Sequence, residues 1–245
     1  MEKWDGRVAV VVDFAGTSLG LAICKDLVNH GLINLAKTLA KENARGKLYP
    51  FQCDVSDEAQ VNPVFRWISE KYDGIDLLIN ICNSMTKGLI LDDDNTAALR
   101  QVMNTNIVGL CLVAREAAKC MTQRLPERKN IGHIIIVSST VGEKIDLFWH
   151  DGSKPINALY PAGKHASKAI VEALRQELLY MEQENVKITA ISPGLVESDT
   201  IHDEIGKEHT ALSASDVSSA ILYAISVKEH VQIHELVIKG VGDFL

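Results

Sequence analysis

Apolar and polar positions follow one another along this chain in two kinds of block. Continuous apolar runs recur at Arg7–Val12, Ile75–Ile81, His133–Val137 and Val186–Ile191, and the segments between them repeat apolar residues every three or four positions. The first pattern is typical of parallel strands buried on both faces, and the second of helices with one buried face. Their alternation predicts an α/β fold, a doubly wound parallel sheet covered by helices on both faces.

The first strand leads into the turn Asp13-Phe14-Ala15-Gly16-Thr17-Ser18-Leu19-Gly20 and then into a helix through His30, closed by Gly31. Small residues between a strand and a helix leave the first N–H groups of the helix free, which is a geometry that binds phosphate. The glycines do not form GxGxxG, and turns of this kind also occur in folds that bind no nucleotide. The turn alone therefore fixes no ligand.

The stretch after this helix has two interpretations. Leu32–Ala36 is a short strand followed by a helix around Lys37–Ala44, or the whole stretch is helical and no second strand exists. We therefore expect a second strand that is short or missing. The next strand is predicted at Lys47–Cys53, and Ser56 is predicted to cap the helix that follows it.

The remaining segments complete the alternation. A long helix is predicted over Asn95–Met121, another over Ser213–Val227, and a last strand over Val231–Lys239. Repeats, low-complexity tracts and linkers are absent from the sequence. Residues 1–245 are therefore interpreted as a single domain.

A helix opening at Tyr160 carries the clearest candidate chemistry. Tyr160 and Lys164 lie four residues apart, so a helix places both side chains on one face. A nearby ammonium favours the phenolate, which predicts a tyrosine pKa drawn towards neutrality, where it serves as a general acid/base. Taken alone, the pair is much more typical of a surface tyrosine and lysine on a solvated first turn.

Composition narrows the class of protein. The 245 residues carry a formal net charge of −7, which argues against nucleic acid as a partner and supplies no basic stretch for a membrane surface. We expect no membrane span and no signal peptide. The five cysteines are scattered without CxxC spacing, which indicates reduced thiols and a cytoplasmic protein. No metal site is expected, because His230 and His234 lie well apart along a predicted strand.

Several short pieces in order resemble the short-chain dehydrogenase/reductase family. They are the glycine-containing turn, Cys53-Asp54-Val55, Ile79-Asn80, Asn106, Ser138-Ser139, Tyr160-x-x-x-Lys164 and Ser192-Pro193-Gly194. The pieces Lys25–Val28, Leu99–Val102 and His234–Lys239 look closest to the insect farnesol dehydrogenase-like members. The resemblance implies a Rossmann-like fold and an NADP-dependent oxidoreductase, with NAD not excluded.

The resemblance also implies four catalytic residues. Tyr160 would exchange a proton with the substrate oxygen, and Lys164 would lower the tyrosine pKa and hold the nicotinamide ribose. Ser139 would hydrogen-bond the substrate oxygen, whereas Ser138 would be a structural residue at the strand end. Asn106 would support Lys164 through a water. The substrate class is an apolar alcohol or carbonyl compound, including an isoprenoid alcohol.

The cofactor-binding residues implied by the resemblance include Asp54, which would accept from the adenine amino group, and Val55, which would pack on the adenine ring. The full set is Gly16, Thr17, Leu19, Gly20, Asp54, Val55, Asn80, Tyr160, Lys164, Pro193 and Gly194. The family also implies a homodimer or homotetramer, assembled through the helices at Asn95–Met121 and Tyr160–Met181.

The chain departs from the family where a dinucleotide should bind. The family turn TGxxxGxG keeps only Gly20, and Asp13 and Phe14 bring negative charge and bulk near the diphosphate. The second strand is shortened, and Asn83 replaces a glycine. An alternative function is therefore a non-catalytic member that binds a ligand or a subunit. A third interpretation is a mis-spliced or incomplete product that folds poorly.

Overall fold

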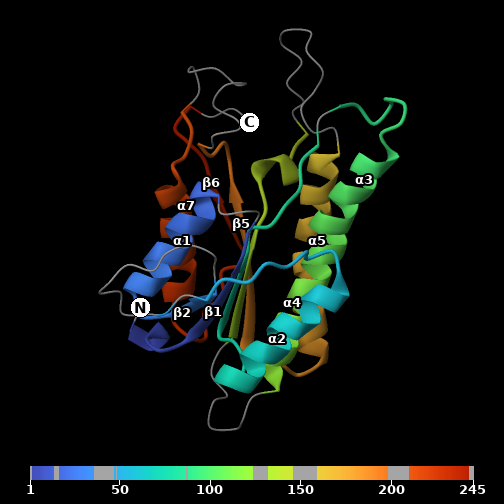
Figure 1. Ribbon diagram of the computed structural model, residues 1–245. Coiled ribbons are helices and arrows are strands. Elements are labelled where there is room, and N and C mark those ends of the chain that lie inside the picture. The colour runs from blue at the N-terminus through green and yellow to red at the C-terminus, as the bar shows by residue number, and fades with distance from the viewer. Residues whose placement is uncertain are drawn as a thin grey trace.

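The computed structural model describes residues 2–13, 17–35, 47, 49–86, 88–123, 132–145, 159–197 and 210–242. Within them, six strands form one parallel sheet in the order β2-β1-β3-β4-β5-β6 (Figure 1). The strands are β1 Val8–Val12, β2 Ile33–Leu35, β3 Leu77–Asn80, β4 Gly132–Val137, β5 Val186–Pro193 and β6 Glu235–Ile238. The predicted α/β fold with a parallel sheet is confirmed.

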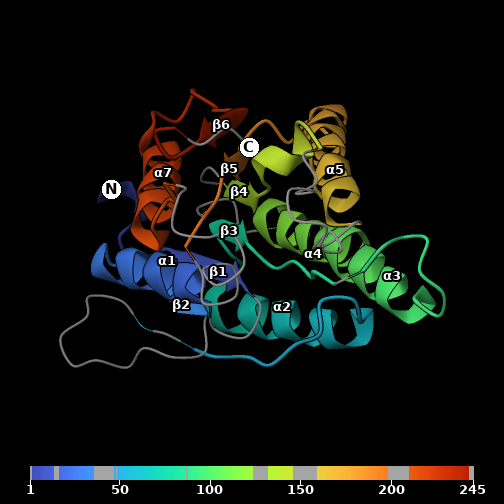
Figure 2. The ribbon, with the colours of Figure 1, turned by 90° about the horizontal axis from the view of Figure 1, so that it is seen from above.

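Helices cover both faces of this sheet (Figure 2). Helices α1 (Ser18–Asn29) and α7 (Ala214–Ser226) lie on one face, and α2 (Glu58–Tyr72), α4 (Leu110–Thr122) and α5 (Tyr160–Tyr180) lie on the other. Each face has its own apolar core. Alternate residues of the buried strands supply the two cores: Val8 and Val10 pack on the α2 side, and Ala9 and Val11 on the α1 side.

On the β2 side of the sheet, one of the two strands predicted between α1 and α2 is present and the other is not. Strand β2 is present but only three residues long, as the short-strand interpretation expected. The strand predicted over Lys47–Cys53 is wrong, because its described residues form no strand. Pro50 lies in the middle of this stretch and has no N–H to donate to a neighbouring strand. The helix predicted over Lys37–Ala44 lies outside the described residues.

Aromatic packing holds this stretch in place of strand pairing. The rings of Tyr49 and Phe51 lie 5.8 and 4.8 Å from that of Trp67 in α2, measured between centroids. Lys71 places its ammonium 4.2 Å from the Tyr49 ring centroid and 4.6 Å from that of Trp67. The stretch is therefore fixed to the outer surface of α2 by ring–ring and cation–π contacts.

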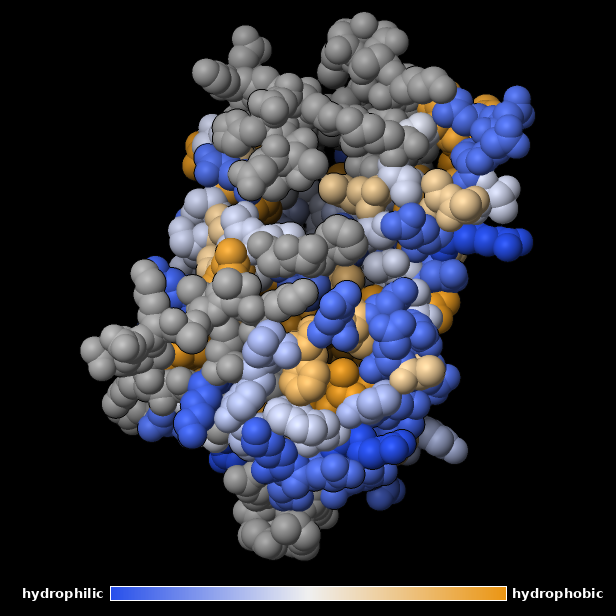
Figure 3. All heavy atoms as spheres, in the orientation of Figure 1, coloured by the Kyte–Doolittle hydropathy of each residue, from blue (hydrophilic) through white to orange (hydrophobic). Residues whose placement is uncertain are grey.

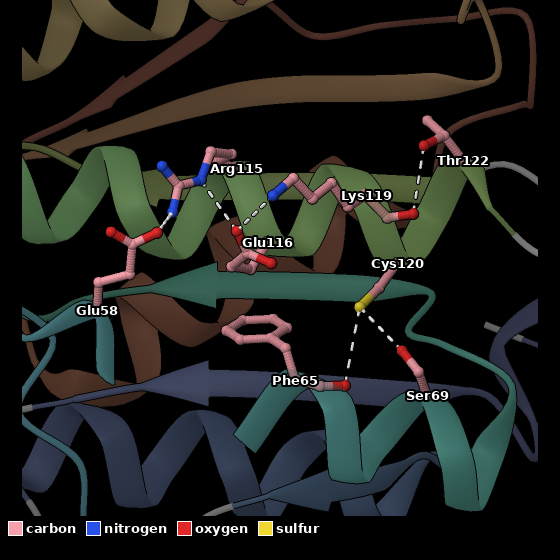
Figure 4. A network of polar contacts seen from close by, with 8 residues as sticks. All are labelled: Glu58, Phe65, Ser69, Arg115, Glu116, Lys119, Cys120 and Thr122. Carbon is pink, nitrogen blue, oxygen red and sulfur yellow. Dashed lines mark hydrogen bonds and ion pairs between the residues drawn. The ribbon is translucent and has the colours of Figure 1, made fainter. Parts of the chain in front are cut away.

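Polar contacts connect α2 to α4 (Figure 4). Arg115 of α4 forms ion pairs with Glu58 at the start of α2 and with Glu116 on its own helix. Further along the pair of helices, Cys120 Sγ lies 3.1 Å from Ser69 Oγ. These contacts hold α2 and α4 side by side on the same face of the sheet.

The N-cap of α2 differs from the prediction. The first residue of α2 follows Asp57, whose carboxylate accepts from Ala59 N, so the cap is Asp57 and not Ser56.

The long helix predicted at Asn95–Met121 is one helical rod with an irregular centre. It consists of α3 (Thr96–Met103), a π-helical segment η2 (Asn104–Gly109) and α4. By length and composition, Thr96–Thr122 would also pass as a membrane span, which the sequence analysis did not anticipate. In the structure α4 packs on the sheet through Leu110, Val113, Ala117 and Met121, as the core helix of a globular protein does.

Figure 3 shows one face of the molecule as mainly hydrophilic, with smaller apolar areas between the polar side chains.

The last strand is shorter than predicted, since β6 spans Glu235–Ile238 and not Val231–Lys239. His230 and His234 therefore lie before this strand. Groups of His, Cys, Asp and Glu that could hold a metal ion do not occur among the described residues.

Candidate active site

The candidate site lies where the strands end. Asn80 ends β3, Ser138 and Ser139 follow β4, and Pro193 and Gly194 close β5. Because all six strands are parallel, their carboxyl ends meet at one edge of the sheet, where folds of this kind bind ligands. The helix α5 begins with Tyr160, and its Lys164 bonds to Val137 O at the end of β4. The helix therefore begins at this same edge.

Tyr160, Lys164 and Ser139 are brought together by α5 and the end of β4. The Lys164 ammonium lies 5.4 Å from the centroid of the Tyr160 ring and donates a hydrogen bond of 3.1 Å to Val137 O, the last carbonyl of β4. The Ser139 side chain interacts with the Tyr160 side chain, and this interaction favours the phenolate. Its Oγ also accepts from Val141 N at 3.3 Å, which fixes the serine at the start of the short helix η4 (Thr140–Gly142).

Burial dominates the protonation of this group. It raises the pKa of Tyr160 above its usual range, while the Ser139 side chain acts in the opposite direction. Burial also lowers the pKa of Lys164 to about 8, because a charged ammonium is poorly solvated there. The expectation that Lys164 draws the tyrosine pKa towards neutrality is therefore wrong for this structure, because desolvation of the phenolate is the largest influence on that pKa.

The two serines after β4 have different surroundings. The Ser138 hydroxyl is buried, lies 2.9 Å from Ser167 Oγ and is directed at Lys164 O at 3.4 Å. Its contacts therefore tie the end of β4 to the second turn of α5. Ser139, in contrast, is only half-buried, and its side chain is the one that acts on the pKa of Tyr160. The role of Ser139 toward a substrate stays a prediction.

Asn106 lies at the irregular centre of the long helix and is held by a loop. Its Oδ1 accepts from Ser84 N at 2.6 Å and its Nδ2 donates to Ser84 O at 2.9 Å. A Cβ on Gly163 would lie 3.3 Å from Asn106 Nδ2, so the asparagine also sits directly against the first turn of α5. Asn106 thus joins the loop after β3 to the helix of Tyr160, a role the sequence did not indicate.

At the start of α1, side chains of the protein already bond to N–H groups of the turn that was predicted to bind phosphate. Thr17 Oγ1 accepts from Gly20 N at 3.1 Å. Thr17 also donates to the Asp13 carboxylate, from its N at 3.0 Å and from its hydroxyl at 2.8 Å. Leu19 packs partly into the apolar core, and Gly16 lies outside the described residues.

The residues predicted for adenine and nicotinamide occupy varied environments. Val55 is buried, and a Cβ on Gly109 would lie 2.8 Å from its Cγ2, so it packs against the long helix. Asp54 is exposed and accepts from Ser56 N and Oγ. Asn80 is buried, and its Oδ1 has no hydrogen-bond partner among the described residues. These environments leave Asp54 and Asn80 with acceptor oxygens for a ligand.

The end of β5 carries Pro193 and Gly194, the last of the predicted cofactor-binding residues. Gly194 N donates to Ile238 O at 2.8 Å, which joins the Pro193-Gly194 turn to β6. Ser192 Oγ donates to Glu235 Oε1 at 2.9 Å, and Lys168 of α5 lies 3.0 Å from the same carboxylate oxygen. The turn is therefore held between β6 and the helix that carries Tyr160.

No role was predicted for Cys82, which follows β3 and whose backbone N donates to Val12 O, the end of β1, at 3.0 Å. Burial raises the pKa of its thiol to about 11, with Asp13 and Asp54 acting in the same direction and Lys164 opposing them. The thiol therefore lies close enough to Asp13, Asp54 and Lys164 for their charges to shift its pKa. One signal for this position was present in the sequence, since Cys82 closely follows the strand end at Asn80.

Comparisons with known proteins agree with this geometry. Residues 7–209 match the family model described as short chain dehydrogenase. The chain is 36% identical over 255 residues to the farnesol dehydrogenase of Aedes aegypti, covering 99% of each. It is 32% identical over 260 residues to dehydrogenase/reductase SDR family member 11 of Mus musculus, covering 96% of this chain and 95% of that protein. The NADP-bound structure of ElxO shares the fold, with a TM-score of 0.75, 22% identity and coverage of 96% and 98%.

Proposed function

Because the chain belongs to the short-chain dehydrogenase/reductase family, we propose that it interconverts an apolar alcohol and its carbonyl compound, with NADP(H) as the hydride carrier. The observation that carries this proposal is the grouping of Tyr160, Ser139 and Lys164 at the carboxyl edge of the sheet. The similarity to a farnesol dehydrogenase supports an isoprenoid alcohol as the first substrate to test.

The residues at this edge fit a nicotinamide dinucleotide at one end. Asn80 Oδ1 is a buried acceptor without a partner in the described part of the chain, and the buried Lys164 ammonium has donors to spare beyond its bond to Val137 O. These two groups would hold the ribose and its nicotinamide. The diphosphate end fits less well, because the Asp13 carboxylate lies on the N-terminus of α1.

The dinucleotide supplies or accepts the hydride, and the protein moves the proton. Tyr160 keeps its phenolic proton because burial raises its pKa, so it acts as the general acid that protonates the carbonyl oxygen in the reductive direction. Ser139, whose side chain already acts on that phenol, orients the substrate oxygen beside it. The Lys164 cation lies against the Tyr160 ring and stabilises the negative charge left when the proton departs.

Asn106 acts as a positioning residue. Its two hydrogen bonds to the backbone of Ser84 hold the loop after β3, and its contact with Gly163 fixes that loop against the first turn of α5. One buried amide thus links the loop after β3 to the helix that carries Tyr160 and Lys164.

The protein is proposed to act as a cytoplasmic homodimer or homotetramer. Apolar side chains remain exposed on the two helices expected to assemble: Met103, Val108, Leu179 and Tyr180. Burying such residues against a second copy would remove them from water.

The experiment that tests the function compares the wild type with Tyr160→Phe, using farnesol with NADP⁺, and then with NAD⁺, and following formation of the reduced nicotinamide. We expect Tyr160→Phe to lose turnover while retaining cofactor binding, since the ring stays and only the proton donor is removed. Tyr223→Phe, which removes an exposed hydroxyl on α7, is the matched control and should be as active as the wild type.

An active Tyr160→Phe variant would contradict the proposed mechanism. A folded wild-type protein that binds neither NADPH nor NADH in calorimetric titration would favour the alternative function, a non-catalytic ligand- or subunit-binding protein. The observation that favours this alternative is the carboxylate of Asp13 at the start of α1.

A further inference from the structure

The carboxylate of Asp13 lies on the first turn of α1. Its oxygens accept from the backbone N and the hydroxyl of Thr17, and Thr17 Oγ1 in turn accepts from Gly20 N. A Cβ built on Gly20 would come within 2.1 Å of Asp13 Oδ2, so the carboxylate fills the space that the missing side chain of Gly20 leaves. Strand β1 therefore ends with a negative charge seated on the N-terminus of the following helix.

This charge reverses the local electrostatics of the helix end. The N-terminus of a helix carries the equivalent of about +0.5 elementary charge, which is what draws a phosphate to it. A carboxylate contributes −1, so the sum at this end of α1 is negative. An incoming diphosphate meets an amide group that is already bonded to Asp13 and a net charge of its own sign.

Charges near the end of β1 also act on the thiol of Cys82, whose backbone N donates to Val12 O at 3.0 Å. For this thiol, Asp13 and Asp54 are negative neighbours that raise the pKa, and Lys164 is the cation that opposes them. Two carboxylates and one ammonium thus act on this position, and the ammonium lies 5.4 Å from the centroid of the Tyr160 ring.

We propose that Asp13 is an internal competitor of the dinucleotide diphosphate, which sets the cofactor affinity of this chain to a low value. The inference rests on the proposed function. The carboxylate occupies the helix end that the diphosphate needs, and cofactor binding requires it to be displaced. The same contact caps α1. It therefore stabilises the helix that follows β1 and at the same time lowers the affinity for the cofactor.

The test is calorimetric titration of wild type and Asp13→Asn with NADPH and, separately, with ADP as a ligand that has the diphosphate but no nicotinamide. Asparagine keeps an acceptor for Thr17 N and removes the charge. We expect Asp13→Asn to bind both ligands about tenfold more tightly at low salt, and the gain to shrink in high salt. Without ligand, Asp13→Asn should melt at a lower temperature than the wild type.

Asp26→Asn is the matched control. Asp26 lies on the same helix, two turns further along, and accepts from Ser218 Oγ at 2.6 Å, so its substitution removes an equal charge away from the helix end. Its affinity for NADPH should stay within about twofold of the wild type. Asp13→Ser gives a second neutral variant, which keeps the test open if Asp13→Asn does not fold.

The outcomes separate the inference from the proposed function. A wild type that binds NADPH as tightly as both neutral variants overturns the role of Asp13 and leaves the enzyme function standing. A gain that Asp26→Asn shares, or that is independent of salt, overturns it as well. If folded wild type and neutral variants all fail to bind NADPH, NADH and ADP, the proposed function itself is refuted.

Discussion

A histidine buried at the start of β4 predicts how the stability of this protein changes in acid. His133 is 2% exposed, and its Nε2 lies 2.8 Å from Thr189 Oγ1. The threonine hydroxyl donates to Ile233 O at 2.6 Å, so its proton is committed and the histidine must be the donor, which assigns the Nε2–H tautomer. The imidazole is therefore held between β4 and Thr189 of β5.

Burial lowers the pKa of His133 from 6.5 to about 3, and the neighbouring cations Lys187 and Lys3 act in the same direction. The unfolded chain takes up a proton below pH 6.5 while the folded chain does not. Stability is therefore unaffected by this group above pH 6.5 and is lost as the pH falls from there towards 3, by about 1.4 kcal/mol per pH unit. At pH 5 the loss amounts to ~2 kcal/mol.

The assay is chemical denaturation of the wild type and His133→Gln at pH 7.5, 6 and 5. Glutamine retains an N–H donor for Thr189, so we expect a variant that is less stable at pH 7.5 but that loses ~2 kcal/mol less than the wild type on going to pH 5. His230→Gln, at an exposed position, is the control and should follow the wild type. Equal pH slopes for wild type and His133→Gln would refute the reasoning.

Two further predictions concern the candidate site. Asn106→Asp replaces the group that donates to Ser84 O by an acceptor, so we expect the free energy of unfolding to fall by about 2–3 kcal/mol at neutral pH in urea denaturation; an unchanged midpoint would contradict the role of this amide. Cys82, whose pKa burial raises to about 11, should be alkylated by iodoacetamide at pH 8 more slowly than the exposed Cys111, as followed by peptide mass spectrometry. NADPH should slow Cys82 further and leave Cys111 unchanged, whereas equal protection of both would place the cofactor elsewhere.

The buried strands, the helices and the closeness of Tyr160 to Lys164 could be predicted, because each depends on residues that are near one another in the sequence. Buried parallel strands read as continuous apolar runs, and the α/β order places Ser139, Asn80 and the Tyr160 helix at the same edge of the sheet. The i,i+4 spacing of Tyr160 and Lys164 was likewise enough to place the ammonium beside the ring. These are consequences of chain geometry, and no tertiary contact is needed to infer them.

The features that were missed depend on contacts between distant segments. The bond between Asn106 and Ser84 joins residues 22 positions apart, and no local pattern announces it. The failure of Lys47–Cys53 to form a strand follows from Pro50 and from the rings of Trp67 and Tyr72 on α2. The pKa of Tyr160 was predicted in the wrong direction because the sequence shows the neighbouring cation but not the depth of burial.

The position of the short strand β2 determines how much the rest of the sheet depends on it. Among the residues that the structure describes, β2 lies at the border of the sheet and pairs only with β1, whereas β4, which leads to Ser139, pairs with both β3 and β5. A strand at this border can be shortened without unpairing any other strand. Changes in length are thus tolerated at β2, whereas β4 is held on both sides up to the strand end that leads to Ser139.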